Sequence, residues 1–458
     1  MPNNTSALLS QDHELIERIM DGSLKIAIYG LGHVGSPLAA AWLRAGCHVI
    51  GVDTSPEVLT AARKGRILIP EPGIAEAYEE GLKTNRFEVT NDPIDASRRS
   101  YFKMICVPVL NRSMSADLSA VCSVATSIGI GLKKGDIVSL NPSVPPGTTE
   151  DTVIPIIEKS SGLSVKHDFC MVYNPERIYE GRALKDIEEN YPAIISSVGP
   201  DSSRISHALY SIIFKKGVLR ISSIKAAEAE KLFEGIYRDV NIALANEMAR
   251  VCDRTGIDFW ETRYAANSQP YCNIHKPGIG VGGACIPVYP QFILGLAERL
   301  NLRCNLTKMG RELNDSMPSY CVKQALQLMR KFDPSKLNVT ILGLAFRGGV
   351  SDTRLSPTYR IIEELKKAGV KKIKIHDPLV TEDANLNRDV TLTNNLEESL
   401  SHCDLVIVAA DHQEYRKLGK KRLGNVSIYD GRGVIDRESI NLINYSAIGF
   451  KSRSNGNS

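Results

Sequence analysis

A single cysteine follows a cluster of glycines in the segment 276–290, which reads KPGIGVGGACIPVYP. The glycines are Gly278, Gly280, Gly282 and Gly283. A backbone without side-chain bulk can wrap closely around a ligand, and Cys285 can then present one thiol to it. This pattern is typical of a covalent catalytic site. The alternative is an inert buried thiol next to a plain loop, because isolated cysteines are often buried residues.

A second chemical signal lies in residues 25–53, where an apolar strand, a glycine-rich turn, a helix and a second strand follow one another. The turn reads Gly30-Leu31-Gly32-His33-Val34-Gly35. Its first glycine permits a tight turn, its second lets backbone approach a pyrophosphate, and its third lets the helix pack on the strand. The helix N-terminus then faces the phosphates. Asp53 ends the second strand, where it can bind ribose hydroxyls and would repel a 2′-phosphate, so the sequence predicts an NAD site.

Further strands are expected at five places before residue 224, alternating with helical patterns. They are 101–109, 136–143, 168–175, 193–199 and 218–223. This alternation predicts a doubly wound parallel sheet, whose ligands bind beyond the carboxyl ends of the strands. Pro108, Ser143 and the charged segment 174–182 should therefore lie near the cofactor. That segment, NPERIYEGR, is either part of the active edge or a solvated charged loop.

A long helical pattern over 225–255 and a later α/β pattern complete the chain. About thirty helical residues span about 45 Å, which predicts a helix that joins two domains and pairs with a symmetry mate. Lys231 lies beside the apolar stripe of this helix. It is either a structural lysine or a functional residue of the site. The loops of the α/β pattern carry Arg347, Arg354 and Arg432, which suit a diphosphate, although surface salt bridges would give the same pattern.

The predicted organisation has three domains of α/β, helical and α/β type. They are a Rossmann-type NAD-binding domain at 1–222 with a short leading helix at 11–20, a central helical dimerisation domain with the cysteine loop at 223–335, and a smaller Rossmann-like domain that binds the UDP-sugar at 336–450. A disordered polar tail is expected at 451–458.

Composition and charge narrow the function class. The net charge is +4 without a basic tract, which gives no argument for nucleic acid or a membrane surface. Ten cysteines occur singly, with no CxxC pair and no Cys/His cluster, so we expect no metal site and no disulfide framework. Reduced thiols in the cytoplasm are the simplest interpretation, and the N-terminus has the pattern of neither a signal peptide nor a membrane span.

Five motifs, taken in order, resemble the UDP-glucose/GDP-mannose dehydrogenase family over about residues 24–435. They are GLGHVG with Asp53, NPERIYEGRA, EAEKLFEGIYRDVNIALANE, KPGIGVGGACIPVYP and LAFRGGVSDTRLSP. The forms PERIYEG and RDVNIALANE are more similar to the branch that oxidises UDP-N-acetylmannosamine or UDP-N-acetylglucosamine than to the UDP-glucose branch.

The resemblance implies a four-electron oxidation of the sugar C6 alcohol, with two NAD and one water, through a thiohemiacetal and a thioester on Cys285. It implies that Lys231 stabilises an oxyanion and that Glu180 organises a water or acts as a base. The cofactor-binding residues that it implies are Gly30, Gly32, His33, Val34, Gly35, Asp53, Pro108, Ser143, Glu180 and Arg354. The substrate-binding residues that it implies are Glu176, Arg177, Lys231, Tyr271, Lys276, Gly278, Gly282, Gly283, Arg347 and Arg432.

Four positions depart from the family pattern. Tyr289 stands where the family has Asp, Gly235 where it has Asn, Ala284 where it has His or Ser, and Tyr271 where it has Arg. A phenol with a reference pKa of about 10 cannot replace a carboxylate base at neutral pH. We therefore expect slow thioester hydrolysis, on a sugar whose substituent fills the space left by Gly235.

Two alternatives stay open. One is a UDP-glucose 6-dehydrogenase, and the other is a nucleotide-sugar-binding protein that has lost catalysis. The presence of both Cys285 and Lys231 argues against the second, because a dead site needs neither a thiol nor an ammonium group.

Overall fold

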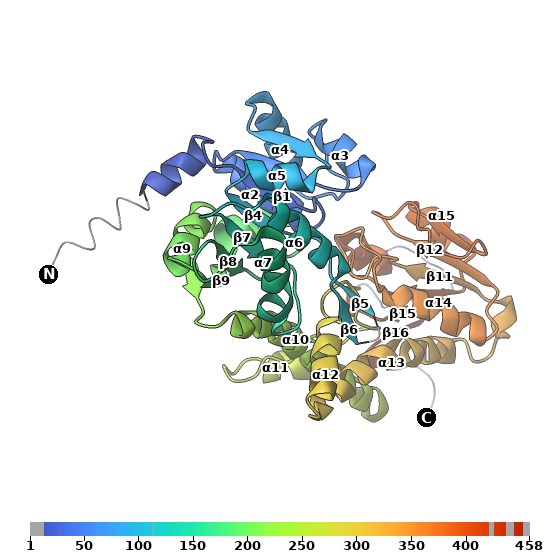
Figure 1. Ribbon diagram of the computed structural model, residues 1–458. Helices are drawn as coiled ribbons and strands as arrows, with labels where there is room; N and C mark the ends of the chain where they lie inside the picture. Colours follow the sequence, from blue (N-terminus) through green and yellow to red (C-terminus); the bar gives the residue numbers. More distant parts are fainter. Residues whose placement is uncertain (1–12, 113, 421–425, 437–443, 452–458) are drawn as a thin grey trace. The chain divides into compact units, whose positions relative to one another are not determined.

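The computed structural model describes residues 13–112, 114–420, 426–436 and 444–451, and it divides into two compact units, Met1–Phe233 and Glu234–Ser458 (Figure 1). The expected leading helix covers residues 13–20, and residues 11 and 12 lie outside the described part. Lys451 belongs to a strand, and the rest of the expected tail also lies outside it. None of the described helices is both long enough and apolar enough to span a membrane.

The first unit contains an eight-stranded sheet in the order β10-β9-β8-β7-β4-β1-β2-β3. Its strands are β1 (Ile26–Tyr29), β2 (Val49–Val52), β3 (Phe87–Thr90), β4 (Phe102–Ile105), β7 (Ile137–Leu140), β8 (Cys170–Tyr173), β9 (Ala193–Val198) and β10 (Val218–Arg220). A small antiparallel hairpin of β5 (Leu110–Arg112) and β6 (Ser115–Asp117) follows β4.

The sheet is parallel from β3 to β8, but β9 runs antiparallel to β8, with Tyr173 opposite Ser196. The expectation of a wholly parallel sheet is therefore wrong at this edge. A parallel pair needs a crossover, usually a helix that packs on the sheet. The segment between β8 and β9 forms only α8 (Ala183–Lys185) and a five-residue π-helix (Asp186–Asn190), so the chain returns in the opposite direction.

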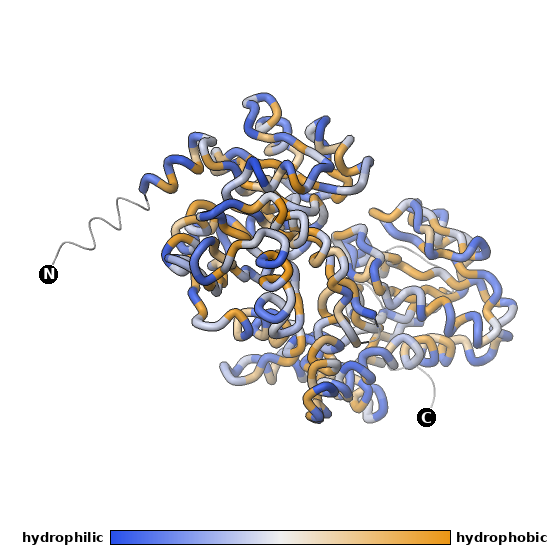
Figure 2. Tube along the Cα trace, in the orientation of Figure 1, coloured by the Kyte–Doolittle hydropathy of each residue, from blue (hydrophilic) through white to orange (hydrophobic). Residues whose placement is uncertain are grey.

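Helices cover both faces of this sheet because alternate strand residues point to opposite sides. Ile26 and Ile28 of β1 lie in one core cluster, with residues of α2 (Gly35–Arg44), α4 (Ile74–Lys83) and α9 (Ser202–Ile213). Ala27 and Tyr29 lie in another, with residues of α5 (Pro93–Arg99), α6 (Ser119–Gly131) and α7 (Ile154–Ser161). Hydrophobic and hydrophilic residues alternate along α4 and α9, as expected for helices with one buried side, whereas nearly all of α2 is buried (Figure 2).

The second unit contains a seven-stranded sheet in the order β13-β12-β11-β14-β15-β16-β17, parallel except for β17. Its strands are β11 (Asn338–Leu342), β12 (Lys372–His376), β13 (Val390–Thr393), β14 (Leu405–Val408), β15 (Ser427–Asp430), β16 (Asn444–Ala447) and β17 (Phe450–Lys451). Its helices include α11 (Phe259–Ala266), α12 (Tyr289–Arg299), α13 (Asn305–Leu328), α14 (Pro357–Lys367) and α15 (Leu396–Leu400).

The two sheets begin with the same local device. Gly30 and Gly343, with φ of +94° and +106°, open the turns after β1 and β11. Asp53 after β2 and Asp377 after β12 each accept a hydrogen bond of 2.8 Å from the amide of the residue that follows the glycine. The second α/β region therefore repeats the first one's turn without its full glycine pattern.

The 32-residue helix α10 (Ile224–Thr255) matches the predicted long helix and is anchored by buried polar groups. Glu228 accepts backbone amides of Gly147 and Thr149 at 2.6 and 2.8 Å. Further along, Asp239 binds Arg311 of α13 at 2.5 Å. The motif RDVNIALANE is thus partly a packing motif, because it carries Asp239, one member of this buried pair.

The apolar stripe predicted on α10 faces outward over much of its length. Leu232 is buried, but Leu244, Met248 and Val251 are exposed. The buried side of the helix carries small residues such as Ala245 and Ala249, which let neighbouring segments approach closely.

Candidate active site

The glycine turn after β1 fits a dinucleotide. A Cβ on Gly35 would overlap the Gly30 carbonyl oxygen, so that glycine is required for the helix to pack. A Cβ on Gly32 would meet no atom within 4 Å, which leaves open space above the backbone. Val34 occupies the N-cap position of α2, and its side chain accepts no hydrogen bond from the first turn. The amides of that turn can therefore face an anion. Asp53 accepts the amide N–H groups of Leu31 and Ser55, which fixes its carboxylate at the end of β2.

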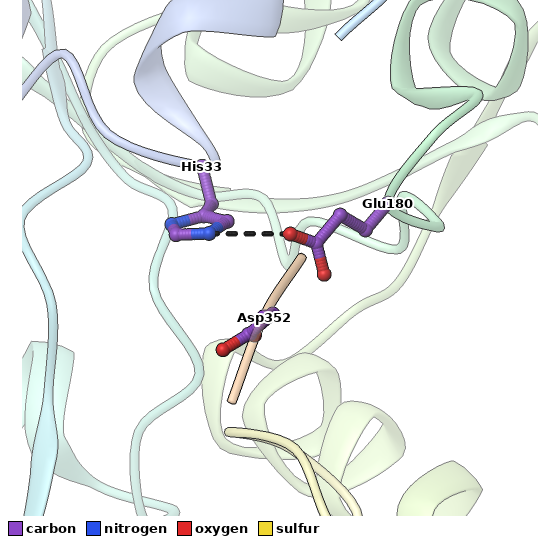
Figure 3. Close-up of side chains that lie close together, drawn as sticks. All are labelled: His33, Glu180 and Asp352. Atoms are coloured by element: carbon purple, nitrogen blue, oxygen red, sulfur yellow. Dashed lines mark ion pairs between the residues drawn. The ribbon is translucent and has the colours of Figure 1, made fainter. Parts of the chain in front are cut away.

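Glu180 lies in the charged segment after β8 and pairs with His33 of the glycine turn, with 3.3 Å between Oε1 and Nε2 (Figure 3). Glu71 holds the same segment by accepting the backbone amides of Gly181 and Ala183. Two residues predicted from different motifs, His33 and Glu180, are therefore brought together within the first unit.

Glu176 has acid–base properties that the sequence analysis missed. Its Oε1 accepts the amides of Arg177 and Ile178 at 2.8 and 3.2 Å, while its Oε2 is buried and has no hydrogen-bond partner within the described residues. Burial raises the pKa of Glu176 to about 7, and the positive charge of Lys231 opposes that shift. The only sequence signal was its place just past a strand end, which does not report burial.

The other predicted residues of the first unit differ in their surroundings. Lys231 is buried on α10, 9% exposed. Arg177 is engaged by protein, because it donates to the Pro192 carbonyl at 2.7 Å and lies over the Tyr191 ring. Ser143 is half-buried beyond β7, and Pro108 is exposed beyond β4.

The thiol of Cys285 is accessible. All ten cysteines lie within the described residues, and Cys285 is the one that is exposed. Its carbonyl accepts the amides of Val288 and Tyr289, both at 3.0 Å, so it forms the first turn leading into α12.

The glycines before Cys285 serve protein packing, which differs from the expectation that they clear space for a ligand. A Cβ on Gly282 would lie 2.6 Å from the Leu355 carbonyl oxygen, and one on Gly280 would lie 2.8 Å from Pro357. Gly283, with φ of +89°, donates its amide to the Arg354 carbonyl at 2.9 Å. The segment is therefore clamped against the loop that precedes α14.

Gly278 links the same segment to α10 and to the second sheet. Its amide donates to Asn246 Oδ1 at 2.8 Å, and a Cβ would lie 2.7 Å from a guanidinium nitrogen of Arg432. Arg432 donates to the carbonyls of Ala409 and Phe346 at 2.7 and 3.2 Å. Arg432 therefore lies against the glycine segment.

The remaining predicted residues of the second unit differ in their contacts and exposure. Arg354 forms a forked pair with Asp352, the shortest bond being 2.6 Å. Arg347 donates to the carbonyl of Gly348 at 3.0 Å. Lys276 is exposed, and Tyr271 is 95% exposed after α11.

Two departures from the family pattern touch each other. A Cβ on Gly235 would overlap Cδ2 of the Tyr289 ring and lie 3.2 Å from its Cγ. Tyr289 itself is 6% exposed. The expectation that a sugar substituent fills the space beside Gly235 is therefore wrong, because the Tyr289 ring occupies it.

Three family models match the chain. They describe the UDP-glucose/GDP-mannose dehydrogenase family's NAD binding domain at 24–214, its central domain at 225–316 and its UDP binding domain at 340–437. A UDP-N-acetyl-D-mannosamine dehydrogenase of Pyrococcus horikoshii is 32% identical over 92% of this chain and 98% of its own. The chain belongs to the UDP-glucose/GDP-mannose dehydrogenase family.

The chain is accordingly an NAD-dependent nucleotide-sugar dehydrogenase, and the predicted family, fold class and cofactor are confirmed. An NDP-N-acetyl-D-galactosaminuronic acid dehydrogenase of Ralstonia nicotianae is 32% identical over 89% of this chain and 96% of its own. The solved structure of the UDP-D-ManNAc dehydrogenase from Pyrococcus horikoshii matches with a TM-score of 0.84 and 30% identity, over 93% of this chain and 99% of that one.

Proposed function

We propose that this dehydrogenase oxidises the C6 alcohol of UDP-N-acetylmannosamine to the carboxylate through covalent adducts on Cys285. The observation that carries the mechanism is the accessibility of that thiol at the start of α12, while the other nine cysteines are buried or half-buried. The two relatives described above are dehydrogenases of N-acetylated nucleotide sugars, which supports an N-acetylated substrate.

The chemistry balances in three stages. NAD, when bound, accepts a hydride from C6 in each of the two oxidations, and one proton is released in the first. The Cys285 thiol gives up its proton and its sulfur adds to the resulting aldehyde, whose oxygen takes up one proton, so that a thiohemiacetal forms. The thiohemiacetal then loses a hydride and a proton to become a thioester. Water then attacks the acyl carbon, the C–S bond breaks, and the acid and the thiol are released.

Lys231 and Glu176 divide the acid–base work. The buried ammonium of Lys231 stabilises negative charge on the C6 oxygen. Glu176, with its pKa near 7 and an unpartnered oxygen, takes the proton of the attacking water. Glu180, held against His33, orders that water or shares this role.

The UDP group is proposed to bind at the glycine segment and at Arg347 and Arg432. Arg432 lies against Gly278, and guanidinium groups match diphosphate oxygens. Arg354 is proposed to reach the cofactor. For this, its guanidinium group would have to leave Asp352 or contact Asp352 and the cofactor at the same time.

The test is an NADH assay on UDP-N-acetylmannosamine, UDP-N-acetylglucosamine and UDP-glucose, with product mass. We expect two NADH per acid formed, fastest with UDP-N-acetylmannosamine. Cys285→Ser should form no thioester-bound protein and no acid, whereas the control Cys272→Ser should behave like the parent. UDP-glucose as the fastest substrate would replace the sugar assignment.

A binding protein without turnover is the second candidate, favoured by the Tyr289 ring where the family has a carboxylate. Thermal stabilisation by a UDP-sugar with no NADH from any substrate would establish it and overturn the enzymatic proposal.

We also propose a homodimer through α10, in the cytoplasm. Its outward stripe of large apolar residues is unusual for a surface helix and would be covered by a second copy. The stripe consists of Phe233, Tyr237, Leu244, Met248 and Val251, all exposed. All ten cysteines are free thiols, which suits a reducing compartment.

A further inference from the structure

We propose that Tyr289 is a positioning residue whose ring, seated on Gly235, fixes the first turn of α12 and thereby sets where the Cys285 thiol lies. This inference rests on the proposed role of Cys285 as the nucleophile. It concerns a contact inside the second unit, between the start of α12 and α10.

The contact is close enough to determine position. The notch left by Gly235 receives the ring edge, since a Cβ there would overlap Cδ2 and lie 3.2 Å from both Cγ and Cε2. Both residues are buried. An aromatic side chain has few rotamers. When its ring is buried and fixed by close packing, the position of its own backbone is therefore restricted as well.

That backbone is bonded directly to the nucleophile's residue. The amide of Tyr289 donates to the Cys285 carbonyl at 3.0 Å, as does the amide of Val288. On the other side, the amide of Gly283 donates to the Arg354 carbonyl at 2.9 Å. The backbone of Cys285 is therefore fixed on both sides. Before it, Gly283 is bonded to Arg354, and after it, the Tyr289 ring is seated on Gly235.

Gly235 lowers the stability of helix α10, and the contact with Tyr289 explains why a glycine is nevertheless present. A glycine inside a helix is less stable than alanine by about 1 kcal/mol, and Gly235 lies in the interior of the 32-residue α10. Alanine would be the better helix residue, but its methyl group would displace the Tyr289 ring. The two residues thus form one unit, and a change at 235 should act only through the ring at 289.

The experiment is a double-mutant cycle with Gly235→Ala and Tyr289→Ala, together with Tyr289→Phe. The readouts are kcat and KM for the UDP-sugar and the rate at which iodoacetamide alkylates Cys285, followed by peptide mass. The control is Gly310→Ala on α13, a helix glycine whose Cβ would lie 3.3 Å from Val240 of α10 and so has more room.

We expect Gly235→Ala to lower kcat about 100-fold, the loss that a displacement near 1 Å produces, with KM changed less than about threefold. Tyr289→Phe should keep most of the parent's kcat and alkylation rate, because the ring stays. In the Tyr289→Ala background, Gly235→Ala should have no further effect. Gly310→Ala should resemble the parent.

Additive losses in the double variant, or equal losses for Tyr289→Phe and Tyr289→Ala, would overturn the proposal. If Gly235→Ala does not fold, the comparison of Tyr289→Phe with Tyr289→Ala decides alone. The alkylation rate needs no turnover, so it still tests the positioning of Cys285 if no UDP-sugar is oxidised and the proposed function itself fails.

Discussion

Glu176→Gln should separate two effects of the buried carboxylate. One is its contribution to the rate of thioester hydrolysis, and the other is its effect on the free energy of unfolding. Burial raises the pKa of Glu176 from 4.5 to about 7. Each pKa unit corresponds to 1.36 kcal/mol, so ionised Glu176 destabilises the folded protein by at most about 3 kcal/mol. Glutamine has nearly the same shape and no charge, and it removes this penalty.

The pH dependence follows from the direction of the shift. Below pH 4.5 the carboxyl is protonated in both states, and it contributes no pH-dependent difference. Between pH 4.5 and about 7 the folded state holds more protons than the unfolded state, so stability falls as pH rises. Glu176→Gln should therefore be more stable than the parent by about 2–3 kcal/mol at pH 8 and equal to it at pH 4.

Activity should change in the opposite direction. A base must be ionised, so the parent's hydrolysis step should accelerate as pH rises through about 7. Glu176→Gln should lose about 10²–10⁴-fold in that step while NADH still forms, and the thioester on Cys285 should accumulate to a mass that can be measured on the intact protein.

Urea unfolding at the two pH values and rapid-quench mass measurements test both parts. Glu80→Gln, on the exposed surface of α4, is the matched control and should change neither quantity. An equal stability change at pH 4 and pH 8 would refute the assignment of a neutral buried carboxyl, and an unchanged hydrolysis rate would refute its role as the base.

Further expectations concern the cofactor, the helix pair and the dimer. Asp53→Asn should raise KM for NAD about 10-fold, because it would weaken the charged hydrogen bond that we propose Asp53 makes to the ribose, and NADH formation at varied NAD measures it. Asp239→Ala should lower the free energy of unfolding by about 3 kcal/mol, because it removes the buried partner of Arg311 and leaves that guanidinium, among the described residues, only the exposed Asp315; urea unfolding measures it. Leu244→Glu should give a monomer in light scattering, whereas an unchanged mass would remove the α10 interface.

The sequence allowed the nucleotide turn to be predicted almost completely, because its chemistry is local. Gly30, Gly35 and Asp53 act through backbone geometry within about thirty residues of one another, and the structure shows the turn and the fixed carboxylate. The same holds for the long helix and for the alternation of strands and helices. These features depend on periodicity and on turn chemistry, which a single sequence records.

Features that depend on burial or on the direction of a return strand could not be predicted. The antiparallel direction of β9 results from the short helical turns that replace a crossover helix between β8 and β9. The hydrophobic periodicity of a strand is the same whether it runs parallel or antiparallel to its neighbour. The raised pKa of Glu176 depends on groups packed around it in three dimensions. The outward stripe of α10 was visible as a pattern, but the pattern does not say which side of a helix faces its own protein.

The departures at positions 235 and 289 show why unusual residues should be interpreted together. Considered separately, Gly235 indicated empty space for a sugar substituent and Tyr289 indicated a missing base. In the folded chain one fills the space of the other, so a single structural exchange accounts for both. The exchange removes a carboxylate one turn from Cys285, and the proposed mechanism then requires another group, Glu176, to take the proton of the attacking water. A catalytically competent enzyme with Tyr289 therefore depends on Glu176 more strongly than one with a carboxylate at 289 would.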